Sequence, residues 1–170
     1  MEEASIFISI TALAVSIITL WLTLLRKGTV CMTQPTVIFF GPDGGDKKPS
    51  KIFFRTLLYS TSRKGRVVEN LYVRLKKGET QQNFNIWVYG SKELSRGSGM
   101  YVGETGIATN HHFLLPKDTH QYEFKEGLYT LEIYVRLVGD KADKLLHKTA
   151  LTISQSEASQ LKQGYHGIYF

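Results

Sequence analysis

The stretch IFISITALAVSIITLWLTLL, residues 6–25, decides the layout of this chain because it holds twenty consecutive residues without a charged side chain. At about 1.5 Å per helical residue it spans roughly 30 Å, the thickness of the hydrocarbon core of a bilayer. A cleavable signal peptide shows a basic start, a shorter apolar run and a small-x-small cleavage site, and this segment lacks all three. We therefore predict a retained transmembrane anchor over residues 1–27, with the lipid bilayer as its first partner.

The charges that flank this stretch predict its orientation. Arg26 and Lys27 follow it, whereas only the acidic Glu2 and Glu3 precede it. Lysine and arginine resist translocation, so the C-terminal domain is expected in the cytoplasm. Cys31 is the only cysteine, which excludes an intramolecular disulfide and agrees with a reducing compartment. The predicted location is the cell (inner or plasma) membrane, crossed once.

Small and hydroxylated residues line one face of the predicted helix at spacings of three and four residues. In a bilayer, close packing of small residues and hydrogen bonds between hydroxyl groups hold helices together. This face therefore predicts association with a second copy or with another membrane protein. The alternative is that each hydroxyl bonds a carbonyl one turn earlier in a solitary helix. The residues of this face are Ser9, Ala12, Ser16, Thr19 and Thr23.

Residues 28–153 alternate apolar and polar side chains, the pattern of half-buried strands. The turn residues of 77–80 separate two such runs and predict that they form a hairpin. No long amphipathic helical run occurs before residue 154, so we expect a mainly β domain, an antiparallel sandwich of two sheets. The predicted strands cover residues 36–40, 52–60, 71–76, 84–89, 106–115, 129–137 and 146–153.

The segment Gly127-Leu128-Tyr129-Thr130-Leu131 resembles the start of strand F in immunoglobulin-like domains, where a tyrosine hydrogen-bonds back across the corner. Lys125 and Leu131 stand where antibody-type domains carry an aspartate and a cysteine. The resemblance is therefore to the fold alone. It implies an immunoglobulin-like β-sandwich, a fold that hosts many unrelated functions.

Residues 154–170 predict a short helix followed by an aromatic tail. Ser154-x-x-Glu157 has the spacing of a capping box, and Gly164 is a suitable C-terminal cap. The tail is rich in apolar side chains, which a frayed chain end does not need. It either docks on the sandwich or serves as a peptide for the groove or sheet edge of a partner. The residues concerned are Tyr165, Ile168, Tyr169 and Phe170.

The glycine-rich stretch at residues 90–106 is the first candidate for ligand contact. Its glycine spacing is one residue longer than the dinucleotide fingerprint, and no βαβ pattern surrounds it. We expect a long flexible connection that carries Lys92 and Arg96, with Tyr101 able to stack on a ligand. The alternative is a plain loop whose glycines serve turns with positive φ.

No pattern in the sequence predicts catalysis, a metal or another cofactor. His111 and His112 are adjacent, so on a strand they point to opposite faces and cannot readily bind one ion. A G-x-S-x-G nucleophile motif is absent from the sequence.

Basic residues are concentrated next to the anchor. Residues 28–77 hold ten basic and three acidic side chains, whereas 78–170 hold nine and ten. This asymmetry makes anionic lipid headgroups a candidate partner. Nucleic acid ranks below lipid, because a tethered basic surface already has anionic lipid beside it.

Together these observations predict a membrane-tethered binding or assembly module, and no enzyme. It presents a cytoplasmic β-sandwich at the membrane surface and associates through its transmembrane helix. The alternative is a solute-binding or enzymatic domain that faces the periplasm or the exterior from a signal-anchor, with the 90–106 loop over its pocket.

Overall fold

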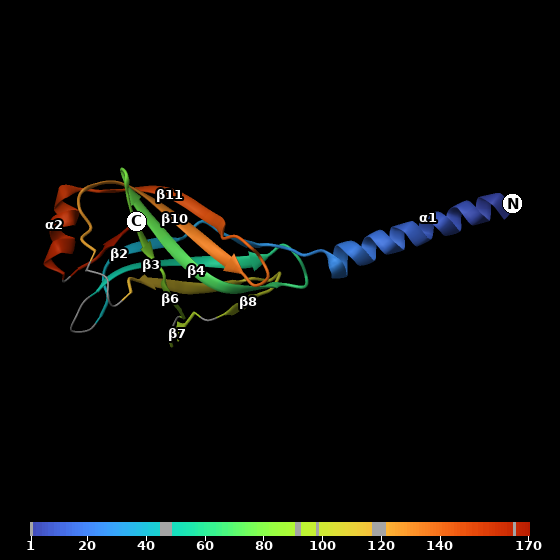
Figure 1. Ribbon diagram of the computed structural model, residues 1–170, viewed down its shortest axis with the longest axis horizontal. Helices are drawn as coiled ribbons and strands as arrows, with labels where there is room; N and C mark the ends of the chain where they lie inside the picture. Colours follow the sequence, from blue (N-terminus) through green and yellow to red (C-terminus); the bar gives the residue numbers. More distant parts are fainter. Residues whose placement is uncertain (1, 45–48, 91–92, 98, 117–121, 165) are drawn as a thin grey trace.

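The computed structural model describes residues 2–44, 49–90, 93–97, 99–116, 122–164 and 166–170. The chain is mainly β, with antiparallel sheets, and an apolar helix projects from the β-rich domain at the N-terminus (Figure 1). The C-terminus lies on the domain.

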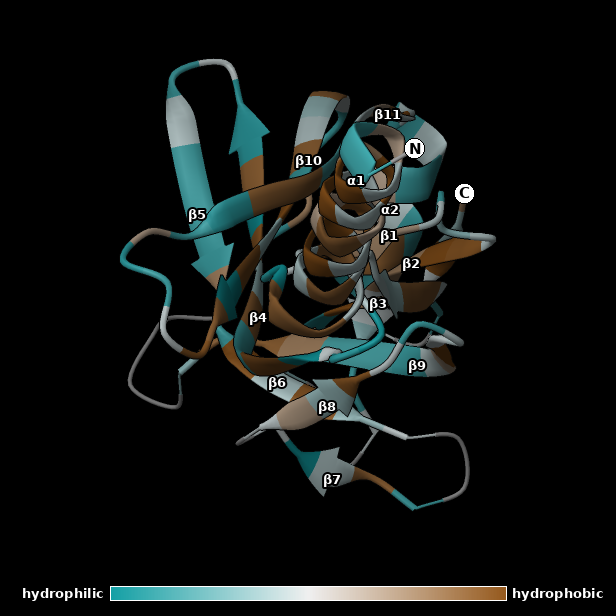
Figure 2. Ribbon diagram, turned by 90° about the vertical axis from the view of Figure 1, so that its right-hand side faces the viewer, coloured by the Kyte–Doolittle hydropathy of each residue, from teal (hydrophilic) through white to brown (hydrophobic). Residues whose placement is uncertain are grey.

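The helix α1 (Glu2–Leu20) continues into a π-helical turn, η1 (Trp21–Leu25), and Arg26 ends it with an extended backbone. Residues Glu2–Leu25 are long and apolar enough to cross a membrane. None of them is buried in the protein. Figure 2 looks along α1 and shows hydrophobic residues along the helix, with hydrophilic ones at its N-terminal end.

The first sheet has the order β12-β2-β3-β9-β6-β7, and β1 pairs with the end of β3. All its pairs are antiparallel. The strands are β1 (Val30–Met32), β2 (Val37–Pro42), β3 (Ser50–Ser60), β6 (Ile86–Tyr89), β7 (Ser95–Arg96), β9 (Ile107–Leu114) and β12 (Ile168–Tyr169).

The second sheet has the order β11-β10-β4-β5, and β8 pairs with the start of β4. These pairs are antiparallel too. The strands are β4 (Arg66–Lys77), β5 (Thr80–Phe84), β8 (Met100–Val102), β10 (Gly127–Leu137) and β11 (Lys144–Ile153).

One hydrophobic core contains inward-facing side chains from both sheets, which the alternation of each strand supplies. Removing this apolar surface from water is the main favourable term in folding of the domain. Its largest fully buried members include Phe40, Phe54 and Phe113 from the first sheet and Phe84, Tyr129 and Leu131 from the second.

The hairpin predicted between residues 71–76 and 84–89 is wrong in its second half. Gly78, with φ of 55°, makes the turn, and β5 pairs with β4 as far as Phe84. The chain then leaves the second sheet at Asn85, and β6 pairs with β9 in the first. The side chain directed into the core is consequently Trp87, because a strand that changes sheets presents its other face to the same core.

Two predicted local features are confirmed. The helix α2 (Gln155–Gln163) begins with a capping box between Ser154 and Glu157, and Gly164 ends it in the left-handed conformation, φ 70°. At the start of β10, the Tyr129 hydroxyl donates to the Lys125 carbonyl at 2.7 Å. This is the hydrogen bond across the corner that the sequence resemblance implies.

Candidate functional site at the junction of helix and domain

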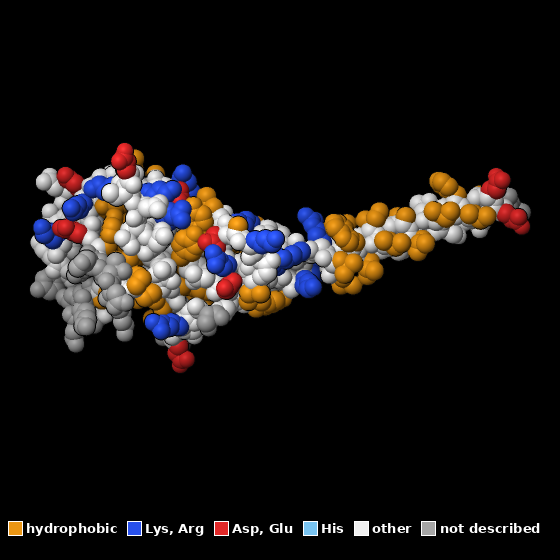
Figure 3. All heavy atoms as spheres, in the orientation of Figure 1, with side chains coloured by type: hydrophobic (Ala, Val, Ile, Leu, Met, Phe, Trp, Pro, Cys, Tyr) orange, Lys and Arg blue, Asp and Glu red, His pale blue; other side chains and the backbone are white. Residues whose placement is uncertain are grey.

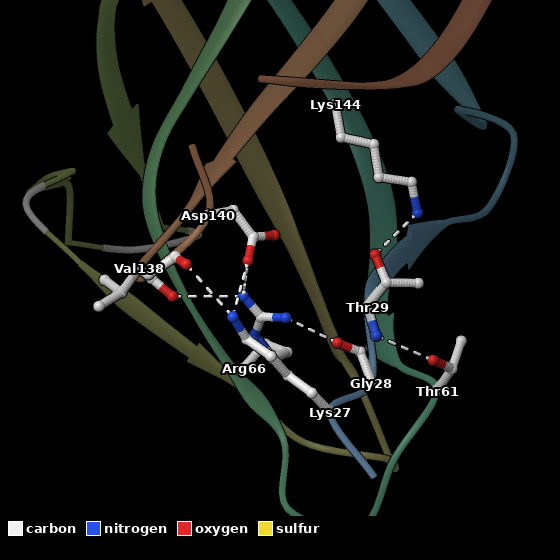
Figure 4. Close-up of polar contacts among 9 residues, drawn as sticks. Lys27, Gly28, Thr29, Thr61, Arg66, Val138, Asp140 and Lys144 are labelled. Atoms are coloured by element: carbon white, nitrogen blue, oxygen red, sulfur yellow. Dashed lines mark hydrogen bonds and ion pairs between the residues drawn. The ribbon is translucent and has the colours of Figure 1, made fainter. Parts of the chain in front are cut away.

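The chain passes from the apolar helix into the β-domain between two turns of that domain. Residues 61–65 join β3 to β4, and residues 138–143 join β10 to β11. We call residues 27–29, together with 61–66 and 138–144, the junction (Figure 4). Figure 3 shows several lysine and arginine side chains where the β-domain meets the helix.

Arg66, the first residue of β4, is the centre of the junction. Its side chain is only 9% exposed. One terminal nitrogen donates to the Gly28 carbonyl at 2.7 Å, and the other donates to the Val138 carbonyl at 3.2 Å and to Asp140 Oδ1 at 2.8 Å. A planar guanidinium with several donors suits three acceptors that converge from different segments. Arg66 therefore binds the chain leaving the helix to the β10–β11 turn (Figure 4).

Lys27 adds a second cation to the same carboxylate. Its Nζ donates to the Gly139 carbonyl at 3.2 Å and to Asp140 Oδ1 at 3.1 Å. Hydrogen bonds from Arg66, which has the larger effect, and from Lys27 lower the pKa of Asp140 below its usual value. Asp140 is therefore ionised at neutral pH and holds both cations.

The backbone after Lys27 is fixed as well. Thr29 donates its N–H to Thr61 Oγ1 at 3.0 Å, and the Thr61 N–H donates to the Thr29 carbonyl at 2.9 Å. Lys144 Nζ donates to Thr29 Oγ1 at 2.9 Å. A Cβ on Gly28 would lie 2.5 Å from Ser62 Oγ and 2.8 Å from its backbone nitrogen, so this position is closely packed. The domain thus begins at residue 28 without a free linker.

The sequence patterns do not mark Arg66, Asp140 or Lys144 as functional. Gly65 and the polar run at 139–143 do signal turns, and both turns exist. That the two turns meet around residue 28 depends on the pairing of strands far apart in the sequence, which local patterns do not contain.

Arg26 and Lys27, the two residues that predict the membrane orientation, lie on opposite sides of the boundary between the helix and the junction. Arg26 is exposed, and its N–H donates to the Trp21 carbonyl at 2.8 Å as the last hydrogen bond of the helix. Lys27 is already part of the junction.

The predicted helix-packing face has its hydroxyl hydrogens engaged inside the helix. The hydroxyls of Ser9, Ser16, Thr19 and Thr23 each donate to the carbonyl four residues earlier, at 2.7–2.9 Å. This is the arrangement of the solitary-helix alternative. The small size of these four residues and of Ala12 still allows a second helix to pack closely on this face. None of the five side chains is buried in the protein.

The predicted binding loop is not one flexible connection where the structure describes it. Arg96 belongs to β7 and pairs with Val88 in the first sheet, whereas Tyr101 belongs to β8 and pairs with Val67 in the second. The Tyr101 hydroxyl donates to the Lys64 carbonyl at 3.2 Å. Lys92 lies outside the described residues. Short strand pairings on both sheets therefore divide this stretch, and its two described candidates do not share a sheet.

The C-terminal tail is docked on the first sheet. Ile168 is 6% exposed and pairs with Phe40, and the Phe170 ring lies edge-on to Phe40 at 5.2 Å. The backbone of Phe170 exchanges hydrogen bonds of 2.8 and 3.1 Å with Ile38. Tyr169 is exposed, and Tyr165 lies outside the described residues.

The histidine pair points to opposite faces of β9. His111 is fully buried and accepts a hydrogen bond at Nδ1 from Trp87 Nε1 at 3.1 Å. His112 is half-buried, with its ring 4.9 Å from that of Phe53. Among the described residues, no group of three or more His, Cys, Asp and Glu side chains could hold a metal ion.

Comparisons with protein-family models, with curated proteins and with solved structures found no match for this chain. Its function is therefore inferred from its own residues.

Proposed function

We propose that this chain is a single-pass membrane protein whose junction holds an immunoglobulin-like β-domain at the membrane surface, where the domain acts as a binding or assembly module. The observation that carries the proposal is the buried Arg66, which ties the first residue of the domain to a turn at its helix-proximal end. A domain held in this way has restricted position and orientation. Weak contacts with a membrane-bound partner then become effective, because the tether raises the local concentration.

The exposure of the helix supports the bilayer as its environment. Phe7, Ile8 and Leu25 are 73%, 67% and 65% exposed. An apolar surface of this extent is unfavourable in water and favourable among acyl chains, where the helix also satisfies its own backbone hydrogen bonds.

The order of the strands supports the immunoglobulin-like assignment. When the short strands β1, β7, β8 and β12 are left out and the other strands are lettered along the chain, β2-β3-β9-β6 of the first sheet has the A-B-E-D order of such domains. In the second sheet, β11-β10-β4-β5 has the order G-F-C-C′. Tyr129 then lies at the start of the strand lettered F, where the tyrosine corner belongs.

The proposed location is the cell membrane with the domain in the cytoplasm, because Arg26 and Lys27 are the cations that flank the helix. We expect the chain of residues 1–170 to remain with membranes after alkaline extraction and to resist protease in intact spheroplasts until they are lysed. Glu2→Lys with Glu3→Lys places cations on the other flank without touching the junction, and this variant should reduce that protection. Digestion of the unmodified domain before lysis would favour the exterior-facing alternative, and recovery of the chain in the soluble fraction would reject the anchor.

We also propose that the helix associates through its small-residue face with a second copy or another membrane protein. Ser16→Leu is expected to weaken self-association of the full chain in proteoliposomes by roughly 3- to 30-fold, measured by energy transfer between labelled copies, because it separates closely packed helices. Ile17→Leu, on another face of the same turn, is the control and should change little. Equal association in all three proteins would exclude the small-residue face from the contact between copies.

A further inference from the structure

We propose that Val67, Tyr101 and Val138 dock the β-domain on the headgroup layer of an anionic bilayer, next to the point where the helix leaves it. This inference rests on the proposed function, since it requires a membrane-spanning helix. It adds the face of the domain that contacts lipid and the lipid class that this face selects.

The three side chains form a continuous exposed patch on the outer face of the second sheet. Val67, Tyr101 and Val138 are 39%, 58% and 53% exposed. Val67 is the register partner of Tyr101 on β8, and it accepts the Val138 N–H at its carbonyl at 2.9 Å. The patch therefore crosses from β8 over β4 to the end of β10. We call it the apolar patch.

The patch lies beside the chain that emerges from the helix. The Val138 carbonyl and the Gly28 carbonyl accept from the same Arg66 guanidinium. Lys27 contacts Gly139, the next residue along the chain. At the other end of the patch, Tyr101 bonds to Lys64 in the turn that also holds Thr29. Figure 4 shows the Val138 side chain pointing away from Arg66.

The charges around the patch complement an anionic surface. The acidic side chains of the two turns are engaged: Asp140 with Arg66 and Lys27, and Asp143 with Arg136 at 2.7 Å. Two exposed acids border the patch: Glu104, which is 65% exposed and lies 4.0 Å from Arg63, and Glu69, further along β4. Cations predominate toward the helix. The exposed ones are Arg26, Lys27, Arg63, Lys64 and Lys141.

Apolar side chains with a tyrosine, surrounded by lysine and arginine, match the chemistry of the membrane interface. Tyrosine is enriched at the headgroup level, where its ring is buried and its hydroxyl stays in a polar layer. Lysine and arginine next to it are attracted by anionic lipids within a Debye length. The lipid surface is the favoured occupant because the patch lies beside residues 27 and 28, where the chain leaves the proposed membrane-spanning helix.

The test uses the chain of residues 1–170 in nanodiscs. Cys31→Ser removes the native cysteine, and one introduced cysteine carries a fluorescent label. Val138→Cys reports on the patch. Leu128→Cys is the matched control, since Leu128 is 63% exposed and lies at the opposite end of β10, about 33 Å away at 3.3 Å per residue. In discs containing phosphatidylserine, spin-labelled lipid should quench the label at 138 and leave the label at 128 unaffected. Thermal melting of each variant verifies the fold.

Substituting the cations beside the patch measures how much they contribute to docking. Arg63→Gln and Lys64→Gln leave the apolar patch in place, and each should lower the ratio of docked to undocked domain by about fivefold. Discs of phosphatidylcholine alone should show weaker quenching at 138. Equal quenching at 128 and 138, or none at 138 in a chain that inserts, would overturn the docking face alone. A label at 138 that is shielded without lipid quenching would indicate a protein partner instead and would also overturn it. Failure of the chain to enter the discs would overturn the proposed function as well.

Discussion

Arg66→Met is expected to lower the free energy of unfolding of the domain by about 3 kcal/mol. Methionine fills similar volume but cannot donate hydrogen bonds. The carbonyls of Gly28 and Val138 and the carboxylate of Asp140 would each lose a charged donor. Asp140 is a third exposed and can recover part of its loss from water, so the effect should fall at the lower end of the range for a broken buried ion pair. Urea unfolding of the full chain in detergent, followed by tryptophan fluorescence, measures it.

Lys27→Met is the matched control for this variant. Lys27 contacts the same carboxylate, but its side chain is 61% exposed. Water replaces most of what an exposed ion pair contributes, so the loss should stay below about 1 kcal/mol. Equal effects of the two substitutions would show that burial of the guanidinium is not what stabilises the junction.

The burial of Arg66 could not be predicted from the sequence pattern of its strand. The alternation of Leu71, Val73 and Leu75 correctly predicts a strand with these residues inside. Extended backwards, it places Val67 inside and Arg66 outside. The structure has the reverse, because the register between β4 and β10 shifts by one residue where Arg136 faces Asn70 and Leu137 faces Val68. A bulge exchanges the two faces of a strand.

The wrong hairpin prediction for residues 84–89 has the same cause, because the pairing of distant strands is not visible in a local pattern. Phe84, Ile86 and Val88 keep a period of two, and nothing in the letters shows that the chain changes sheets at Asn85. Features set by neighbouring residues were predictable: the capping box of α2, the Tyr129 hydrogen bond and the length of the apolar helix. The junction and the apolar patch were not, because both require the strand pairing and its bulge.

The second large effect concerns acid. We expect the free energy of unfolding to fall by about 2 to 3 kcal/mol between about pH 6.5 and pH 4.5 through His111 alone. Burial of the ring, and then the neighbouring His112, lower the pKa of His111 from 6.5 to about 3. In the unfolded chain the same histidine binds a proton below about pH 6.5. Between these two pKa values His111 is protonated in the unfolded state but not in the folded state. The free energy of unfolding therefore falls as the pH drops, until the pKa of His111 in the folded state is reached.

His111→Gln separates this effect from the rest of the acid response. The glutamine oxygen can accept the Trp87 N–H that His111 Nδ1 accepts at 3.1 Å, and the amide does not titrate in this range. The variant should lose stability at neutral pH through imperfect packing, yet its urea midpoint should change less with pH than that of the unmodified chain. If the urea midpoint of His111→Gln changes with pH as much as that of the unmodified chain, His111 is not the source of the acid sensitivity. His112 and His147, whose pKa values burial also lowers, would then be the candidates.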